Sequence, residues 1–142
     1  MSIDHPLRYV DLPPTSSLGK LWVTHQNAEA ARLEAERRFG QAKSEYSSLN
    51  DWLAAARIDN TEPLIFATKQ AHAELLRRKV NDDQAVLNEA ARLENLAFGE
   101  LNRQYQTYLD IARRYREMRG SVQTETIESW KTQLDHLVLS QE

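Results

Sequence analysis

The fold of this chain is decided by residues 18–56, which read LGKLWVTHQNAEAARLEAERRFGQAKSEYSSLNDWLAAA. Apolar residues, interrupted by two polar ones, recur there at alternating steps of three and four, as along the seam of a coiled coil. The seam consists of Leu18, Leu21, His25, Ala28, Arg32, Ala35, Phe39, Ala42, Tyr46, Leu49, Leu53 and Ala56. Such a helix is not stable alone in water, because its apolar seam must be buried against another helix. The stretch therefore predicts a long helix that is paired with a second one.

The composition extends this interpretation to the rest of the chain. The protein has 142 residues, of which 41% are hydrophobic and 27% are charged. This balance favours one folded domain over a membrane-embedded or disordered chain. Only four Gly and four Pro occur, and three of the prolines lie before Thr15. Helix-breaking residues are therefore scarce in residues 15–142, which favours long uninterrupted helices.

A second helix should follow after a short connection near Ile58. Asn60 or Thr61 can cap it, and Pro63 suits its first turn. Because the connection is short, the second helix should run antiparallel to the first. Its clearest seam is Val80, Gln84, Leu87, Ala91, Glu94, Phe98, Leu101, Tyr105, Tyr108, Ala112 and Tyr115.

The start of the second helix has an apolar stripe in a different phase. That stripe is Ile65, Ala71 or His72, Leu75, Leu76 and Val80. A local adjustment over residues 77–83 would join the two patterns. The Asn81–Asp83 segment either forms a turn between two helices or lies on the exposed side of one helix. We favour one continuous helix with a stutter, because no Gly or Pro interrupts it.

The last segment predicts a shorter third helix. Gly120 ends the second helix, and the arginines before it complement the carbonyl groups of a helix end. The third helix has the seam Ile127, Trp130, Leu134 and Leu137 and runs to about Leu139. The sequence thus predicts an all-α fold, a long coiled-coil-like antiparallel hairpin whose short C-terminal helix completes a three-helix bundle. In this interpretation residues 15–142 form a single domain.

Residues 1–14, MSIDHPLRYVDLPP, are expected to form an extended N-terminal arm, because their three prolines do not permit a helix. A disordered tail is the alternative. We favour an arm that docks on a neighbouring molecule or folds back on the bundle, since a tail does not need so many large apolar residues. The side chains expected to bind a partner are Ile3, Leu7, Tyr9, Val10 and Leu12 in the arm and Ile127, Trp130, Leu134 and Leu137 in the C-terminal helix.

Four polar residues fall on the seams: His25, Arg32 and Glu94, which we expect to control the register, and Gln84. Polar groups inside a helix pair are costly unless they are paired, and they are known to fix the register of coiled coils. With the turn centred near residue 61, position 32 faces about position 90, roughly one helical turn from Glu94. The sequence therefore predicts a contact between Arg32 and Glu94, direct or through one neighbour, and a role in register control.

Residues for catalysis or metal binding form no recognised pattern. The histidines lack a partner at the spacing of H-E-x-x-H or E-x-x-H, and the chain contains no Cys. The H-x-E fragment at His72 therefore lacks the cysteines of the zinc deaminases. The chain has neither a G-x-S-x-G elbow nor a glycine-rich phosphate loop. We expect no enzymatic activity, no cofactor and no metal site.

The densest basic stretch is interleaved with tyrosines and supports an alternative as a nucleic-acid-associated helical protein. Its arginines are Arg103, Arg113, Arg114, Arg116 and Arg119. The tyrosines lie on the seam, which favours burial, and the arginines can pair with acidic residues of the first or last helix. The net charge of −3 gives the whole chain no general attraction to nucleic acid.

The leading hypothesis is a non-enzymatic interaction or assembly protein, such as a scaffold, stalk, adaptor or chaperone within a larger complex. Its expected partners are other proteins or a second copy of itself. In length and heptad pattern the chain is similar to the small coiled-coil stalk proteins of bacterial type III export systems, without a shared motif. A small regulatory or inhibitor protein that binds another macromolecule is a further alternative.

The expected location is the cytoplasm, or a particle or apparatus assembled there. No apolar run approaches 18 residues, so we expect no membrane insertion. The first residues lack the basic start and unbroken apolar core of a signal peptide.

Overall fold

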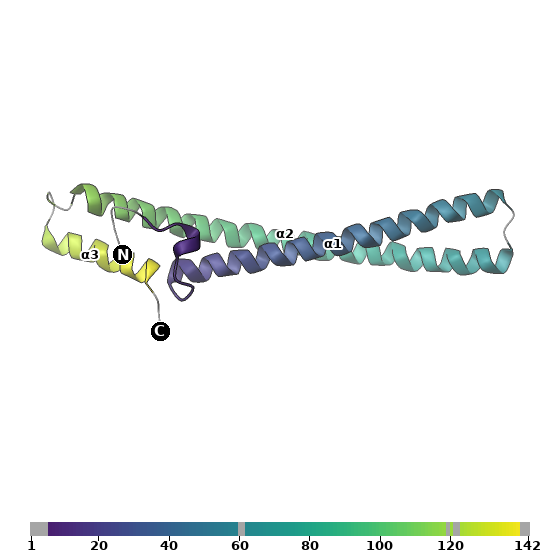
Figure 1. Ribbon diagram of the computed structural model, residues 1–142, viewed down its shortest axis with the longest axis horizontal. Helices are drawn as coiled ribbons and strands as arrows, with labels where there is room; N and C mark the ends of the chain where they lie inside the picture. The colour runs from purple at the N-terminus through teal and green to yellow at the C-terminus, as the bar shows by residue number, and fades with distance from the viewer. Residues whose placement is uncertain (1–5, 60–61, 119, 121–122, 140–142) are drawn as a thin grey trace. The chain divides into compact units, whose positions relative to one another are not determined.

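The computed structural model describes residues 6–59, 62–118, 120 and 123–139. A 3-10 helix at Tyr9–Asp11 precedes the helices α1 (Ser17–Ile58), α2 (Pro63–Met118) and α3 (Thr124–Val138) (Figure 1). The long helices α1 and α2 pack together, and α3 adds a short third helix. No strand occurs among the residues described. The predicted all-α fold, a long helical hairpin with a short C-terminal helix, is confirmed.

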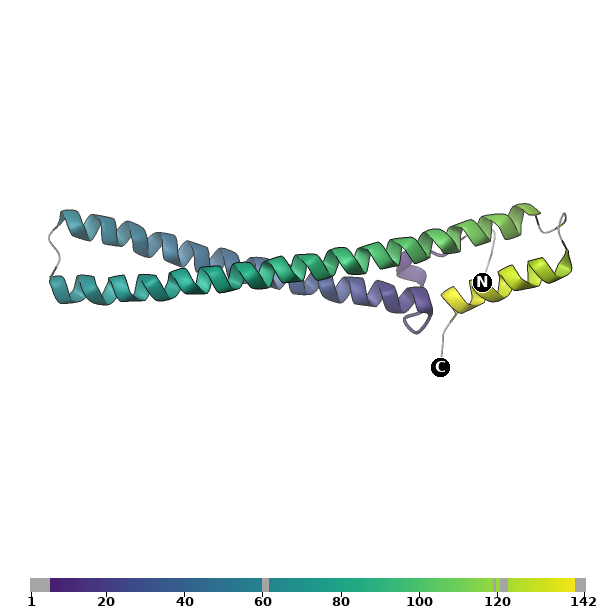
Figure 2. The same ribbon diagram turned by 180° about the vertical axis from the view of Figure 1, so that it is seen from behind.

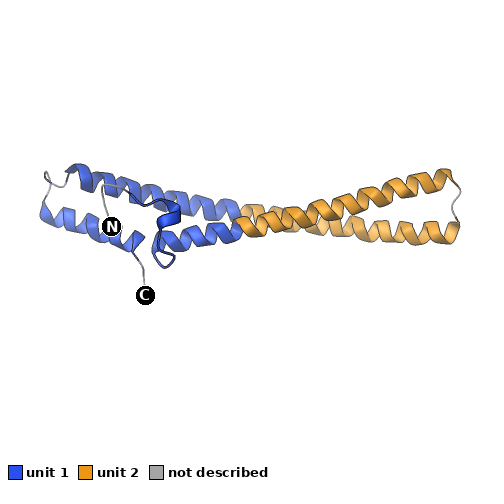
Figure 3. Ribbon diagram, in the orientation of Figure 1, with its two compact units in different colours: residues 1–28, 94–142 blue, residues 29–93 orange. Residues whose placement is uncertain are grey.

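The chain divides into two compact units (Figure 3). Unit 1 comprises residues 1–28 and 94–142, and unit 2 comprises residues 29–93. Each long helix therefore contributes one part to each unit. The prediction of one domain over residues 15–142 stays a prediction.

The seam of α1 lies as the sequence predicts. Every one of its positions is buried or half-buried, from Leu18 to Ala56. Between Val23 and Ile58, every residue of α1 outside the seam is exposed. The alternation of three and four steps was therefore sufficient to identify the packed face of this helix.

Helix α2 continues without interruption through Asn81–Asp83, which confirms the favoured prediction of one continuous helix. The predicted stripe was correct at Leu76 and Val80 and wrong at its other positions. Ile65, Ala71, His72 and Leu75 are exposed, and Phe66 is half-buried in place of Ile65. The residues of α2 that are buried or half-buried in unit 2 include Ala73, Leu76, Val80, Asp83, Leu87 and Ala90.

No stutter is needed in α2, since these positions keep steps of three and four. The sequence interpretation placed Gln84 on the seam, whereas Gln84 is exposed and Asp83 is half-buried. The same displacement of the seam by one position occurs in unit 1, where Ala97 is half-buried and the predicted seam residue Phe98 is exposed. In both places the packed residue is the one directly before the residue that the sequence pattern placed on the seam.

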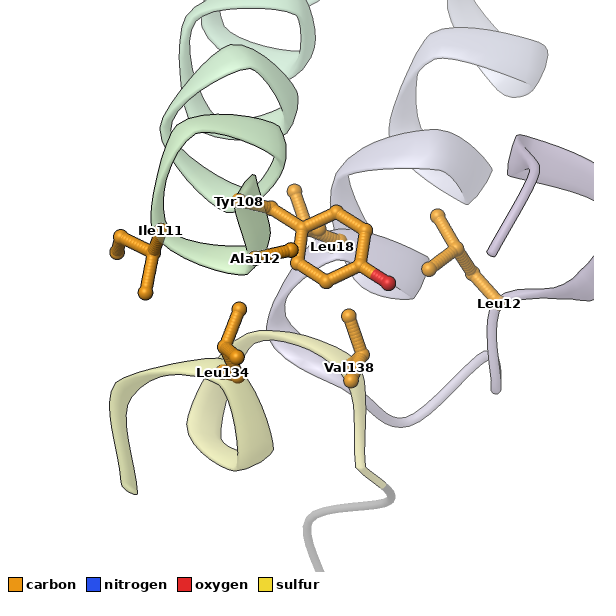
Figure 4. Packing of buried hydrophobic residues seen from close by; sticks show 7 residues of the cluster. All are labelled: Leu12, Leu18, Tyr108, Ile111, Ala112, Leu134 and Val138. Carbon is orange, nitrogen blue, oxygen red and sulfur yellow. The ribbon is translucent and has the colours of Figure 1, made fainter. Parts of the chain in front are cut away.

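Unit 1 has the larger side-chain core (Figure 4). Its buried residues come from the N-terminal segment, the start of α1, the end of α2 and α3: Leu12, Leu18, Tyr108, Ile111, Ala112, Leu134 and Val138. In Figures 1 and 2, α3 lies beside the C-terminal part of α2. The third helix and the N-terminal segment thus bury side chains in one common core.

The start of α1 is fixed by Ser16, the residue directly before the helix. Its Oγ accepts a hydrogen bond from the Gly19 N–H at 2.9 Å and donates one to the Pro13 carbonyl at 2.7 Å. Ser16 is completely buried. It therefore satisfies a helix N–H that has no partner within the helix and ties the helix start to the preceding turn.

Unit 2 is an antiparallel pair of helical segments from α1 and α2 (Figure 2). Its buried hydrophobic residues are mostly small: Ala35, Ala42, Leu53, Ala56, Ala73 and Leu76. Because alanine has little side-chain area, each such residue adds less hydrophobic stabilisation than a leucine or tyrosine. The pair is therefore closely packed but has a thin core.

Ion pairs within single helices cover the outside of unit 2. Examples are Glu34 with Arg37 at 2.7 Å, Glu74 with Arg77 at 2.5 Å and Glu89 with Arg92 at 2.5 Å. Each joins residues three positions apart, which lie next to one another on a helix surface. They support the local helix rather than the contact between helices.

Glu34 gives unit 2 a defined acid dependence. Its carboxylate accepts hydrogen bonds from Arg37 and Arg38, which lower its pKa from 4.5 to about 2. Because the folded pKa is depressed, the stabilisation is complete above pH 4.5 and is lost as the pH falls toward 2. We expect Glu34→Gln to lose less helix content over this range than the natural chain, by circular dichroism. The difference is small, because the pair is exposed; identical acid profiles would contradict the assignment.

Candidate interaction surfaces

The N-terminal segment is held by two tyrosines of α2. The Leu7 N–H donates a hydrogen bond to the Tyr108 hydroxyl at 3.0 Å, and the Tyr105 hydroxyl donates one to the Leu7 carbonyl at 2.5 Å. Both polar groups of one backbone residue are thereby satisfied by side chains. Within unit 1 the segment therefore folds back on its own chain.

Burial raises the pKa of both tyrosines above the usual value. For Tyr105 the nearby Tyr108 and Tyr9 add to this effect, whereas for Tyr108 the Leu7 N–H opposes it by stabilising the phenolate. Each hydroxyl therefore stays protonated through the neutral range. The stabilisation that depends on protonation is present below the normal tyrosine pKa of 10.0 and is lost as the pH rises above it.

A chain of aromatic contacts extends from the segment into α1 and α2. The ring of Tyr9 lies 5.0 Å from that of Trp22 and 4.4 Å from that of Tyr105. The imidazole of His25 lies 5.7 Å from the rings of both Trp22 and Phe98. These separations suit stacked and tilted aromatic pairs. The contacts position Tyr9 from two sides and fix the path of the segment.

The predicted arm residues occupy three kinds of environment. Leu12 is buried in the core, and Leu7 and Tyr9 are half-buried against it. Val10 lies between them in the chain and is 70% exposed. Ile3 lies outside the described residues. Partner binding by this set stays a prediction, and Val10 is the described member whose side chain faces solvent.

The predicted residues of the C-terminal helix lie toward the same core. Leu134 is completely buried, and Trp130 and Leu137 are half-buried against the cluster. Ile127 is also half-buried. Their role in partner binding is likewise still a prediction. Val138, the residue directly after Leu137, is also completely buried beside Leu134 (Figure 4).

The polar seam residues differ in their surroundings. The His25 ring lies between two aromatic rings, and its Nδ1 is buried without a hydrogen-bond partner in the part of the chain that the structure describes. Arg32 forms an ion pair with Glu36 at 2.6 Å. Glu94 is half-buried. Arg32 and Glu94 belong to different units, so the contact expected between them stays a prediction.

Asp83 is a polar seam residue that the sequence interpretation missed. It is half-buried, and its Oδ2 has no hydrogen-bond partner among the described residues. The sequence interpretation placed the neighbouring Gln84 on the seam. Asp83 and Gln84 are both polar, so hydrophobicity could not distinguish between them. Asp83, Lys79, Arg38 and Gln41 line a small hollow in unit 2.

Asp83→Ala should stabilise unit 2 by about 1 to 2 kcal/mol. The change removes a buried unpaired oxygen and introduces a better helix former of the size that this seam already uses. Urea unfolding followed by circular dichroism measures the gain. Asp51→Ala is the matched control, because Asp51 is exposed on α1; it should gain about 0.5 kcal/mol from helix propensity alone. Equal gains would show that burial of Asp83 costs nothing.

The arginine-rich stretch of α2 is partly neutralised by its own helix. Arg103 forms an ion pair with Glu100, and Arg113 forms one with Glu117 at 3.6 Å. Arg114 and Arg116 are exposed, and Arg119 lies outside the described residues. The tyrosines between them are buried or half-buried in unit 1 and do not form an exposed stacking platform. Nucleic-acid binding stays a prediction that these positions do not strengthen.

Among the described residues, no group of three or more His, Asp or Glu side chains is arranged to hold a metal ion. None of the helices combines the length and apolarity needed to cross a membrane.

By its structure, the chain is an all-α protein that consists of a long helical hairpin and a short third helix. Comparisons with protein-family models, with curated proteins and with solved structures found no match.

Proposed function

We propose that this protein is a non-enzymatic interaction protein that serves as a scaffold, stalk, adaptor or chaperone within a larger assembly. The observation that carries the proposal is the set of large apolar side chains exposed on its helices, in its N-terminal segment and directly after α3. They are Val10, Val23, Leu33, Trp52, Ile58, Leu64, Ile65, Leu75, Val86, Leu93, Leu96, Phe98, Met118 and Leu139. Scattered exposed leucines are ordinary, but a set that includes Trp and Phe is typical of binding surfaces.

Long helices suit this role for a physical reason. Their side chains are already held on ordered backbone, so a partner that docks against a helix face does not have to order a flexible segment. Helix faces are recognised through apolar side chains at helical spacing. A protein of this kind therefore acts through surfaces rather than through a concave site.

Val10 is the best placed probe of the N-terminal surface. Its neighbours Leu7 and Leu12 are fixed by hydrogen bonds and by burial, whereas its own side chain faces solvent. Changing Val10 therefore alters the surface without removing a core residue. Removal of residues 1–14 would be a poorer test, because it would also remove Leu12 from the core.

The proposal is tested by purifying the tagged full-length chain from its host and reconstituting the complex from purified components. We expect a protein partner in fixed stoichiometry, whose affinity is reduced about tenfold by Val10→Glu. Gln26→Glu, at an exposed position of α1, is the control for added charge. Recovery of the chain without any stoichiometric protein would contradict the proposal. Unchanged affinity of Val10→Glu would show that the partner contacts other exposed apolar side chains.

A further inference from the structure

Helix α2 carries a second row of side chains in unit 2, which we call the outer row. It consists of Thr68, His72, Leu75, Lys79, Asp82, Val86, Glu89 and Leu93, all exposed, with alternating steps of four and three. From His72 onward each member directly precedes a buried or half-buried residue of the seam. Successive residues are about 100° apart on a helix, so the outer row lies beside the packed face.

The apolar members of the outer row are well exposed. The side chains of Leu75, Val86 and Leu93 are 62%, 56% and 47% exposed, respectively. A row with coiled-coil spacing and large apolar members is what a helix presents to a further helix in a bundle. The thin alanine core of unit 2 leaves the hairpin with little buried area of its own, which a further pair of helices would increase.

The outer row is complementary to itself when one copy is reversed. If two α2 helices cross antiparallel about a twofold axis between Val80 and Asn81, position i faces position 161 − i of the other copy. Leu75 then faces Val86, and Lys79 faces Asp82. His72 faces Glu89, and Thr68 faces Leu93. The first pair is apolar and the second is oppositely charged. The third can form a hydrogen bond, and the fourth places a threonine methyl group against leucine.

Other arrangements of the same row are less favourable. A parallel pair would set Lys79 against Lys79 and Asp82 against Asp82. An antiparallel pair shifted by one heptad would bury Asp82 against Val86 in one direction, or Lys79 against Leu75 in the other. Like charges in contact, or a charge facing an apolar group, cost several-fold to many-fold in affinity. Of these arrangements, only the antiparallel one centred between Val80 and Asn81 places neither like charges together nor a charge against an apolar side chain within the row.

We propose that two copies of this chain associate through the outer row of α2, antiparallel about the point between Val80 and Asn81. The occupant is a second copy because the charge pattern matches its own reverse, which is the self-complementarity required of a twofold interface. This inference goes beyond the proposed function, since it holds whether or not the chain also binds another protein. It concerns residues 68–93 and uses none of the surfaces of unit 1.

Charge exchange tests the register with the full chain. Sedimentation equilibrium should show a dimer, and Lys79→Glu should weaken it about tenfold or more, because two Lys–Asp pairs become repulsive. Asp82→Lys should weaken it similarly, and the double variant should restore it. Lys131→Glu, an exposed change in α3, should have no effect. A natural chain that stays monomeric at all concentrations, or a double variant that is weaker than either single one, would overturn the proposal.

Cross-linking tests the direction of the pair, because the chain has no cysteine of its own. A mixture of the Leu75→Cys and Val86→Cys chains should form a disulfide-linked heterodimer under mild oxidation. Leu75→Cys alone should form little, since its equivalent in the other copy lies several turns away. Efficient cross-linking of Leu75→Cys to itself would indicate a parallel pair and overturn the proposed arrangement.

Discussion

Replacing Tyr108 by alanine is expected to lower the free energy of unfolding of unit 1 by about 4 kcal/mol. The side chain is 1% exposed, and its ring lies among Leu12, Leu18 and Val138 (Figure 4). Alanine would leave a cavity that three separate elements of the chain now line, and these elements cannot all move in to fill it. It would also remove the hydroxyl that accepts the hydrogen bond from the Leu7 N–H.

Tyr108→Phe separates the two contributions. It keeps the ring and removes the hydroxyl, so the loss should be about 1 to 2 kcal/mol. Urea unfolding followed by tryptophan fluorescence measures both variants, since Trp22 and Trp130 lie in unit 1. If Tyr108→Phe destabilised the protein as much as Tyr108→Ala, the hydrogen bond rather than packing would hold the core. If neither variant changed stability, the core assignment would be wrong.

The second large effect is expected at Gly19. A Cβ at this position would lie inside van der Waals contact with the carbonyl oxygen of Pro13, which is backbone and therefore cannot rotate away. The same carbonyl accepts the hydrogen bond from Ser16 that fixes the helix start. Gly19→Ala should therefore force the turn away from α1 and cost about 3 kcal/mol.

Gly40→Ala is the matched control within the same helix. A Cβ at Gly40 would meet nothing within 4 Å, so the change should stabilise the helix by about 1 kcal/mol through propensity alone. Thermal unfolding of the two variants, monitored by circular dichroism, should shift in opposite directions. A stabilising Gly19→Ala would contradict the close approach of the Pro13 carbonyl.

The sequence was sufficient for the architecture because one pattern is uninterrupted. The steps of three and four continue from Leu18 to Ala56 without interruption. They were therefore sufficient to predict which face of α1 is packed and that it packs against another helix. In α2 the apolar residues are divided between two rows. Ile65 and Leu75 belong to the exposed side, and Asp83 belongs to the packed side. Hydrophobicity alone therefore assigned the wrong phase at the start of this helix.

The contacts that hold the N-terminal segment could not be predicted from the sequence. Leu7 and its two tyrosine partners are 98 and 101 residues apart in the chain, and no local pattern specifies hydrogen bonds to one backbone unit. The apolar character of the segment did indicate that it would be buried somewhere. The choice of surface depends on tertiary packing, which brings Tyr105 and Tyr108 beside Leu7.

Attachment of the segment to its own chain has a consequence for the proposed function. A partner that needed Leu7 or Leu12 would have to displace them from the core, at the cost of their buried contacts. A partner that uses Val10 would find this side chain already in place. The two cases predict opposite effects of binding on the stability of unit 1, a decrease in the first and an increase in the second.

Amide hydrogen exchange of the full chain, measured by mass spectrometry, tests most directly the central claim that the N-terminal segment and α3 share one core with α2. We expect slow exchange in residues 6–12 and 134–138, and a parallel loss of protection in both regions in Tyr108→Ala while residues 35–53 stay protected. Exchange of residues 6–12 at the rate of an unstructured chain, with residues 134–138 still protected, would contradict the claim. It would show that the segment is free to bind elsewhere.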